Sequence, residues 1–143
     1  MKKYELTEET VTVYGKTLYR IRAVRDFGSV KTGDLGGYIE KEENLSHSGN
    51  AWVSGNAKVS GNAEVFNTRH FFVQGPIRSR NEFVTFYRTK DNTVGVRCGC
   101  FSGSLQEFVN QVERTHGGSR YEKEYKLAAE LAKVCIRLEE ESK

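Results

Sequence analysis

A basic loop holds the residues best suited to bind an anion. Residues 75–81 read Gly-Pro-Ile-Arg-Ser-Arg-Asn, so two guanidinium groups, a hydroxyl and an amide follow closely on a flexible glycine. Such donors suit a phosphate or a carboxylate, because one arginine can present two parallel N–H groups to the same anion. The alternative is a positively charged linker whose arginines pair with helix carboxylates. We predict a partner-binding or anion-binding site made of Arg78, Ser79, Arg80, Asn81, Tyr87, Lys90, Arg97 and His116.

Cysteine and histidine side chains raise the question of a metal or redox site. Cys98-Gly-Cys100 places two thiols on one face of a strand, and Cys135 and His116 could join them. The same two cysteines continue the column of Val94, which favours packing in the core, where free cysteine is common. We expect no metal and no cofactor. Three cysteines without an apolar leader indicate free thiols in a reducing cytoplasm.

A six-residue repeat is the clearest structural pattern in the sequence. Residues 49–66 read GNAWVSGNAKVSGNAEVF. Valine two positions after alanine places both on one face of an extended chain, and Gly-Asn suits a corner, because both tolerate positive φ. A fixed period of six resembles the left-handed β-helix, although residues 35–66 supply fewer than two coils of ~18 residues. The predicted inward residues are Ala51, Val53, Ala57, Val59, Ala63 and Val65.

Four residues of the repeat are predicted to point outward. We expect an oligomer or partner interface at these positions, because exposed aromatic residues often mark contacts. Packing of the tryptophan under the N-terminal hairpin is the alternative. The outward residues are Trp52, Lys58, Glu64 and Phe66.

Hairpin and helix signals flank the repeat. Residues 10–24 alternate apolar and polar side chains around Gly15-Lys16, which predicts a β-hairpin. Residues 81–88 and 93–101 read as two further strands. Capping boxes starting at Ser104 and Ser119 open two helices. The apolar face of the second helix is expected to hold Leu127, Leu131, Val134 and Leu138.

These elements predict a mixed β and α+β fold. Residues 1–67 are expected to hold the hairpin and a short left-handed β-helix of hexapeptide repeats. Residues 68–143 are expected to form a C-terminal ββαα binding domain, whose helices pack on one sheet face.

Positive charge is concentrated in one segment. The chain has a net charge of +3, and residues 67–101 hold six basic and two acidic residues. This segment could attract phosphate or an acidic protein surface, with nucleic acid as a weaker possibility. No apolar run approaches the ~18 residues of a membrane span. We therefore expect no membrane association and a cytoplasmic location.

Five motifs accompany the Gly-Asn-Ala repeat: Gly33-Asp-Leu-Gly-Gly-Tyr-Ile-Glu-Lys-Glu-Glu-Asn-Leu-Ser46, Ser79-Arg-Asn81, Thr85-Phe-Tyr-Arg-Thr-Lys-Asp91, Cys98-Gly-Cys-Phe101 and Thr115-His-Gly117. Together they resemble a group of small proteins encoded by bacteriophages and prophages. Proteins of this group carry hexapeptide repeats, are often described as polymer-forming, and have no settled function. The resemblance covers nearly the whole chain and implies a phage origin, but it supplies no catalytic residues. Members often carry many more hexads, so a long fibre is not implied.

The resemblance favours a non-enzymatic interaction protein. Accessory phage proteins often antagonise bacterial defence, so the leading hypothesis is an anti-CRISPR-like inhibitor that occludes a host effector. One alternative is an oligomeric sponge for a phosphorylated nucleotide signal, with pockets lined by Arg80, Tyr87 and His116. Another is an acyltransferase-like or carbonic-anhydrase-like enzyme, for which only His47 and His70 lie near the repeat as zinc ligands. We expect a dimer or trimer, because another subunit can cover the open ends of a short repeat.

Overall fold

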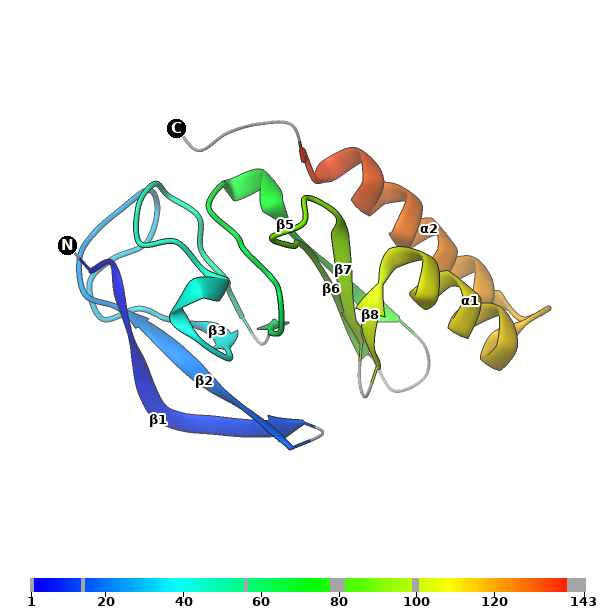
Figure 1. The fold of residues 1–143 in the computed structure, drawn as a ribbon, viewed down its shortest axis with the longest axis horizontal. Coiled ribbons are helices and arrows are strands. Elements are labelled where there is room, and N and C mark those ends of the chain that lie inside the picture. The colour runs from blue at the N-terminus through cyan, green and yellow to red at the C-terminus, as the bar shows by residue number, and fades with distance from the viewer. Residues whose placement is uncertain (1, 14, 56, 78–81, 99–100, 139–143) are drawn as a thin grey trace.

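The described residues form two four-stranded sheets followed by two α-helices (Figure 1). The computed structural model describes residues 2–13, 15–55, 57–77, 82–98 and 101–138. The first sheet has the order β1-β2-β3-β4, with β1 (Tyr4–Val13), β2 (Lys16–Ala23), β3 (Leu35–Ile39) and β4 (Lys58–Val59). The second has the order β5-β6-β7-β8, with β5 (Phe71–Ile77), β6 (Glu82–Arg88), β7 (Val94–Cys98) and β8 (Phe101–Ser104). Helices α1 (Leu105–His116) and α2 (Arg120–Cys135) follow, and short 3-10 turns occur at Glu42–Asn44 and Thr68–His70.

The first sheet begins with a long hairpin. Strands β1 and β2 pair antiparallel from Tyr4 opposite Ala23 to Val13 opposite Lys16. Strand β2 then pairs antiparallel with β3. The hairpin lies where residues 10–24 predict one, and β1 extends it back to Tyr4.

The prediction of a left-handed β-helix is wrong. The described part of residues 49–66 forms one strand, the two-residue β4, and no closed coil. Strand β4 pairs parallel with β3 through Tyr38 opposite Lys58 and Ile39 opposite Val59. The other edge of β3 is occupied by the antiparallel hairpin. Because the repeat is too short to supply a coil on each side of β3, the hairpin covers the edge that a second coil would have paired with.

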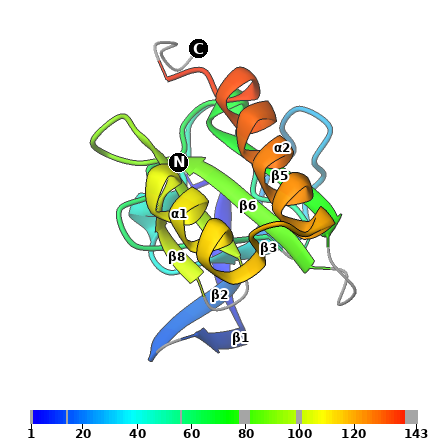
Figure 2. The same cartoon turned by 90° about the vertical axis from the view of Figure 1, so that its right-hand side faces the viewer.

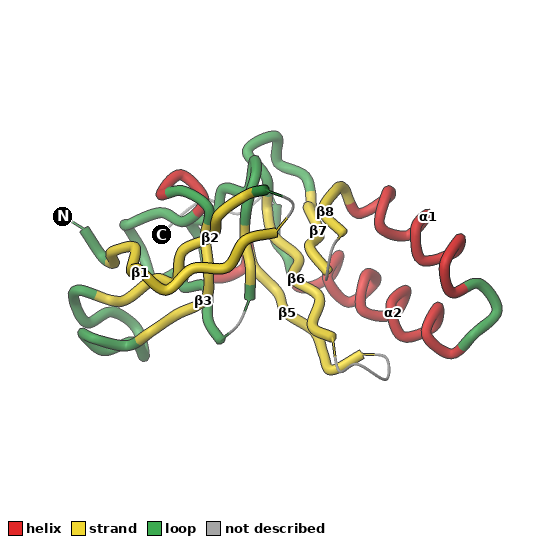
Figure 3. The backbone as a smooth tube through the Cα atoms, turned by 90° about the horizontal axis from the view of Figure 1, so that it is seen from below, coloured by secondary structure: helices red, strands yellow, loops and turns green. Residues whose placement is uncertain are grey.

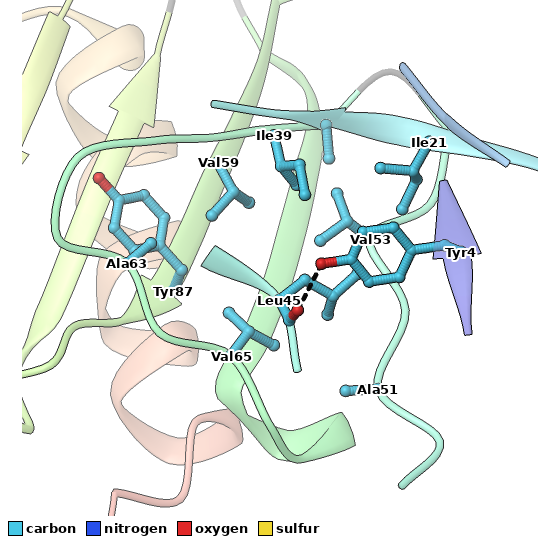
Figure 4. Packing of buried hydrophobic residues seen from close by; sticks show 11 residues of the cluster. Tyr4, Ile21, Ile39, Leu45, Ala51, Val53, Val59, Ala63, Val65 and Tyr87 are labelled. Carbon is cyan, nitrogen blue, oxygen red and sulfur yellow. Dashed lines mark hydrogen bonds between the residues drawn. The ribbon is translucent and has the colours of Figure 1, made fainter. Parts of the chain in front are cut away.

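The inward residues of the repeat nevertheless build the first hydrophobic core. This part of the prediction is confirmed, because alternation of side chains between two faces needs only an extended chain. Ala51, Val53, Ala57, Val59, Ala63 and Val65 are each at most 5% exposed. They pack with Tyr4, Ile21, Ile39 and Leu45 (Figure 4). The Tyr4 hydroxyl donates a hydrogen bond to the Leu45 carbonyl oxygen over 2.5 Å.

A lysine is buried beside this core. Lys3 has no exposed surface, and its ammonium donates to the Ala51 carbonyl oxygen over 2.6 Å. The same ammonium lies 4.8 Å from the centroid of the Phe27 ring. Burial, followed by the nearby charge of Arg25, lowers the pKa of Lys3 to about 8. The folded state is therefore destabilised at neutral pH, because Lys3 remains charged in surroundings that disfavour its charge.

We expect the free energy of unfolding to rise from about pH 8 to about pH 10. In this window the unfolded lysine still holds its proton while folded Lys3, with a pKa of about 8, loses it. The folded state therefore binds fewer protons, and higher pH favours it. The rise should be on the order of 2 kcal/mol. Burial raises the pKa of Tyr4, which opposes the trend only above about pH 10, where the unfolded tyrosine ionises.

Urea denaturation at a series of pH values measures this dependence, with Lys3→Met as the matched variant. Methionine keeps the length of the side chain and removes the titrating group. The variant should lack the rise. An equal rise in Lys3→Met would show that another group is responsible.

The repeat ends on the second sheet. Ala63 forms an antiparallel bridge with Thr89, the residue after β6. The Glu64 backbone N–H donates to the Arg88 carbonyl oxygen over 2.8 Å. The Arg88 guanidinium donates to the Glu64 carboxylate over 2.9 Å. The third hexad therefore links the two sheets.

The C-terminal half is an antiparallel sheet with α1 and α2 over one face (Figure 2). The predicted ββαα unit is wrong, because β5 and β8 flank the two strands that were expected. The Gly75-Pro76 pair predicts a loop where β5 lies. Strand β8 has only four residues, which are too few to show a clear strand pattern. A second hydrophobic core fills the space under the helices, and it includes Val84, Phe86, Val96, Phe108, Val112, Tyr125, Ala128, Ala129 and Ala132.

Candidate functional site: the outer face of helix α2 and the edge of strand β5

The predicted anion-binding residues do not converge on one described surface. Arg78, Ser79, Arg80 and Asn81 lie outside the described residues. Tyr87 and Arg97 are 3% and 5% exposed. Lys90 is exposed in the turn after β6. His116 stacks on Tyr125 at the C-terminal end of α1, with ring centroids 5.4 Å apart. The anion-binding site therefore stays a prediction, with Lys90 as its exposed cation among the described residues.

The outward residues of the repeat make contacts within the chain. Trp52 lies edge-on to Phe27, with ring centroids 5.3 Å apart, and packs against the first core. Its ring also lies edge-on to Tyr4 of β1, with centroids 6.5 Å apart, as expected for the alternative in which the tryptophan packs under the N-terminal hairpin. The Lys58 ammonium lies 5.8 Å from the Tyr38 ring centroid, and burial lowers the pKa of Lys58. Glu64 pairs with Arg88, as described above, and the guanidinium carbon of that arginine lies 4.6 Å from the Phe66 ring centroid. An interface role for these residues stays a prediction.

The two histidines near the repeat have structural roles. The Nδ1 atom of His47 accepts a hydrogen bond from the Lys3 backbone N–H over 2.9 Å. Its Nε2 atom bonds to the Glu42 carboxylate at 2.7 Å, and its ring stacks on Tyr4 at 4.1 Å. His70 is fully buried. Both nitrogens of His47 are therefore engaged within the chain.

The two described cysteines are both half-buried, and one of them contacts the second core. Cys98 is half-buried and packs against that core. Cys135 is half-buried at the end of α2, and Cys100 lies outside the described residues. The position of Cys98 fits the core-packing alternative.

A polar cavity of about 330 Å³ lies between the two sheets. Its lining includes Lys16, Asn62, Tyr87 and Glu107. Lys16 is the one cation and Glu107 the one carboxylate among the lining residues. A phosphorylated nucleotide favours several arginine or lysine donors, so this cavity does not support the nucleotide hypothesis.

Helix α2 presents large apolar side chains to solvent. Leu127, Leu131 and Val134 are 70%, 44% and 74% exposed. They lie at positions i, i+4 and i+7 and so share one face of the helix, which we call the outer stripe of α2. The sequence assigned this face to the core, and that assignment is wrong. The buried face consists of Tyr125, Ala128, Ala129 and Ala132, while Leu138 packs in part against the second core.

A groove of about 250 Å³ separates the outer stripe from β5. Strand β5 supplies Gln74, Pro76 and Ile77, and α2 supplies Glu124, Leu127, Ala128 and Leu131. The lining is mostly apolar, and Glu124 is its one charged residue. Because β5 is the edge strand of the second sheet, the groove lies at the margin of that sheet.

Small residues and ion pairs set the orientation of α2. Alanine at three buried positions lets the helix approach the sheet closely. Tyr125 anchors the helix edge-on against Phe108 of α1, with ring centroids 5.7 Å apart. The Lys126 ammonium pairs with Glu113 of α1 at 2.7 Å and with Glu122 of α2 at 3.0 Å. These contacts leave the outer stripe pointing away from the core.

One signal in the sequence could have identified this surface. Helix α2 carries two apolar stripes, one of small residues with Tyr125 and one of large residues. A helix with a single packing partner needs one apolar stripe, so a second stripe indicates a second partner. Hydrophobicity alone favours burial of the stripe of large residues, although close packing on the sheet requires the smaller ones.

Comparisons with known proteins do not assign a function. Neither a scan of protein-family models nor a search of curated proteins finds a match for the chain. Among the described residues, no helix has the length and apolarity to cross a membrane. Over the same residues, no group of three or more His, Cys, Asp or Glu side chains is placed to hold a metal ion.

Proposed function

We propose that the protein is a non-enzymatic interaction protein that binds a partner protein through the outer stripe of α2. The observation that carries this proposal is the exposure of three large apolar side chains in one stripe beside an apolar groove. Contiguous apolar surface is typical of interaction sites, whereas single exposed apolar residues are ordinary. Burial of the exposed part of each side chain would contribute roughly 1–2 kcal/mol before the cost of association is subtracted.

The biological role that we propose is antagonism of bacterial defence by a phage-encoded protein in the cytoplasm of the infected host. The protein would bind a host effector and occlude its working surface. The sequence motifs support the phage origin by resemblance. The link between the two sheets supports the occlusion mechanism. A protein that keeps its shape when it binds an effector prevents other ligands from reaching the covered area. A dimer or trimer would present several copies of the stripe.

We expect the double variant Leu127→Asp/Leu131→Asp to lose partner capture. Two carboxylates in the stripe would have to be buried without partners, which weakens binding by about 100-fold or more. Tagged chains are incubated with lysate of a phage-susceptible bacterium, and retained proteins are quantified by mass spectrometry. Stability should change by less than about 0.5 kcal/mol for each substitution, because both side chains are exposed.

The matched control is Leu35→Asp. Leu35 is 55% exposed in β3 and lies outside the stripe. This variant should retain the same proteins as the wild type. The proposal fails if the double variant and the wild type capture the same proteins in equal amounts.

A further inference from the structure

We propose that the polar cavity between the two sheets binds a free amino acid with a short, uncharged polar side chain. This inference goes beyond the proposed function, because the outer stripe of α2 does not line this cavity. Lys16 would pair with the carboxylate of the ligand, and Glu107 would pair with its ammonium group. The side chain of the ligand would enter the buried part of the cavity. The volume of about 330 Å³ is within the range of small-molecule sites.

The cavity is formed by segments that are far apart in the sequence. The start of β2 supplies Lys16, and the corner of the third hexad supplies Gly61 and Asn62. The end of β6, the turn that follows it, the start of β7, β8 and the first turn of α1 supply the rest of the lining. The Lys90 backbone N–H donates to the Asn62 carbonyl oxygen over 2.8 Å and so holds the corner against that turn. Main-chain contacts therefore form the cavity before any ligand binds.

The two opposite charges of the cavity lie at its mouth. The Lys16 side chain is 49% exposed, and Glu107 is exposed in the first turn of α1. The Lys16 ammonium is 4.0 Å from Glu40 Oε1, which is longer than a hydrogen bond, so its N–H groups can donate to a ligand. The Glu107 carboxylate accepts from the Ser104 backbone N–H over 2.8 Å, and a carboxylate has room for further donors. Both charged groups can therefore bind a ligand while they keep these contacts.

Hydroxyl groups surround the inner part of the cavity. Tyr87 and Thr89 are 3% and 4% exposed, and the hydroxyl end of Tyr87 points away from most of the first core (Figure 4). The Tyr87 hydroxyl bonds to the Ser102 side chain, and the hydroxyl oxygens of Thr89 and Thr93 are 2.7 Å apart. Each hydroxyl offers one donor and two acceptor lone pairs, so these bonds leave capacity for a ligand. An uncharged polar side chain can use this capacity, whereas an apolar side chain cannot.

The charges of the lining distinguish an amino acid from other small polar ligands. A sugar can bond to the hydroxyls, but it would compensate neither charge. A simple carboxylate or amine would match one charged side chain and lie near a like charge. An amino acid carries both charges in one small head group and is neutral overall, which complements one ammonium and one carboxylate.

Thermal unfolding of the full chain with a panel of free amino acids and sugars tests the ligand class. At least one of serine, threonine, asparagine and glutamine should raise Tm by about 3 °C or more at saturation, because a ligand of the folded state stabilises it. Leucine, phenylalanine and glucose should leave Tm unchanged. An equal rise with leucine would contradict the polar side chain. A rise with sugars alone, or with no compound of the panel, would overturn the proposal.

Calorimetric titration with the best amino acid and two derivatives tests each charge pair. The primary amide lacks the carboxylate and the N-acetyl derivative lacks the ammonium group, so each should bind about tenfold more weakly. Lys16→Met should weaken binding of the amino acid about tenfold and leave binding of the amide unchanged. Glu107→Gln should have the corresponding effect, with the N-acetyl derivative unaffected. Glutamine at this position keeps the capping box, so the start of α1 is retained.

Lys90→Met is the matched control, because Lys90 is exposed and lies outside the lining. It should bind the amino acid as the wild type does. Equal losses in Lys90→Met and Lys16→Met would show an effect of net charge and overturn the pairing. Wild-type affinity in both Lys16→Met and Glu107→Gln would overturn the site.

The stripe variant Leu127→Asp/Leu131→Asp separates this proposal from the proposed function. It should bind the amino acid as tightly as the wild type while it loses partner capture. Retained capture with normal amino-acid binding would sink the proposed function and leave the cavity site standing. Lost capture, together with no amino-acid binding by the wild type, would do the reverse.

Discussion

Tyr87→Ala should lower the free energy of unfolding by about 3–5 kcal/mol, as for other large-to-small changes in a well-packed core. Tyr87 lies on β6 of the second sheet, yet it is 3% exposed and packs in the first core (Figure 4). A Cβ atom added to Gly95 would lie 2.5 Å from its ring, so the ring packs closely on β7. The cavity left by alanine would therefore weaken the contact between the sheets.

Equilibrium denaturation with urea measures this loss, and two variants serve as controls. Tyr87→Phe keeps the ring and removes only the hydroxyl, so it should cost about 1 kcal/mol. Phe83→Ala alters the same strand at a side chain that is 56% exposed, and it should cost less than Tyr87→Ala. A loss below about 1 kcal/mol for Tyr87→Ala would show that the ring does not hold the sheets together.

Gly36→Ala should lower the free energy of unfolding by about 1–3 kcal/mol, the usual cost of overpacking. A Cβ atom on Gly36 would lie 2.5 Å from the Val53 carbonyl oxygen and 2.8 Å from Cγ1 of Ile21. Backbone oxygen cannot rotate away as a flexible side chain can. The neighbouring Gly37 N–H donates to the same Val53 oxygen over 2.7 Å, so β3 would have to move away from the repeat and stretch this bond.

Leu35→Ala is the matched control, because Leu35 is adjacent in β3 and 55% exposed. It should change stability by less than about 0.5 kcal/mol. Thermal unfolding of both variants gives the comparison. Equal stability of Gly36→Ala and the wild type would contradict the close approach of β3 to the repeat.

Local patterns in the sequence predicted the inward residues of the repeat and the start of α1. Both depend on neighbours within six positions along the chain. The backbone N–H of Glu107 donates to the Ser104 hydroxyl over 3.1 Å, and that of Ser104 donates to the Glu107 carboxylate over 2.8 Å, as a capping box requires. Such signals need no knowledge of the rest of the fold.

The absence of a closed coil could not be predicted, because it depends on which strand occupies each edge of β3. A six-residue period specifies which side chains point inward but not how many coils form. The repeat is short, and the hairpin pairs with the edge that a further coil would need. Tertiary packing determines which strand pairs with an edge, and local periodicity does not encode that pairing.

The candidate surface on α2 was misassigned for a similar reason. Both faces of the helix have helical spacing, and hydrophobicity alone favours Leu127 and Leu131 for the core. The short distance between α2 and the sheet instead favours burial of Ala128 and Ala132, which are 3% and 0% exposed. That distance is set by packing across the whole second core.

Partner binding through the outer stripe of α2 is tested by a footprint of the partner on the chain. Hydroxyl-radical labelling of the free protein and of the complex captured from lysate, read by mass spectrometry, gives the reactivity of each exposed side chain. Leu127, Leu131 and Val134 should each become at least about fivefold less reactive in the complex, because a bound partner excludes solvent from the centre of its interface. The outward residues of the repeat should keep their reactivity. Unchanged reactivity of the outer stripe, with protection at Trp52 or Phe66, would contradict binding through the stripe and place the interface on the repeat.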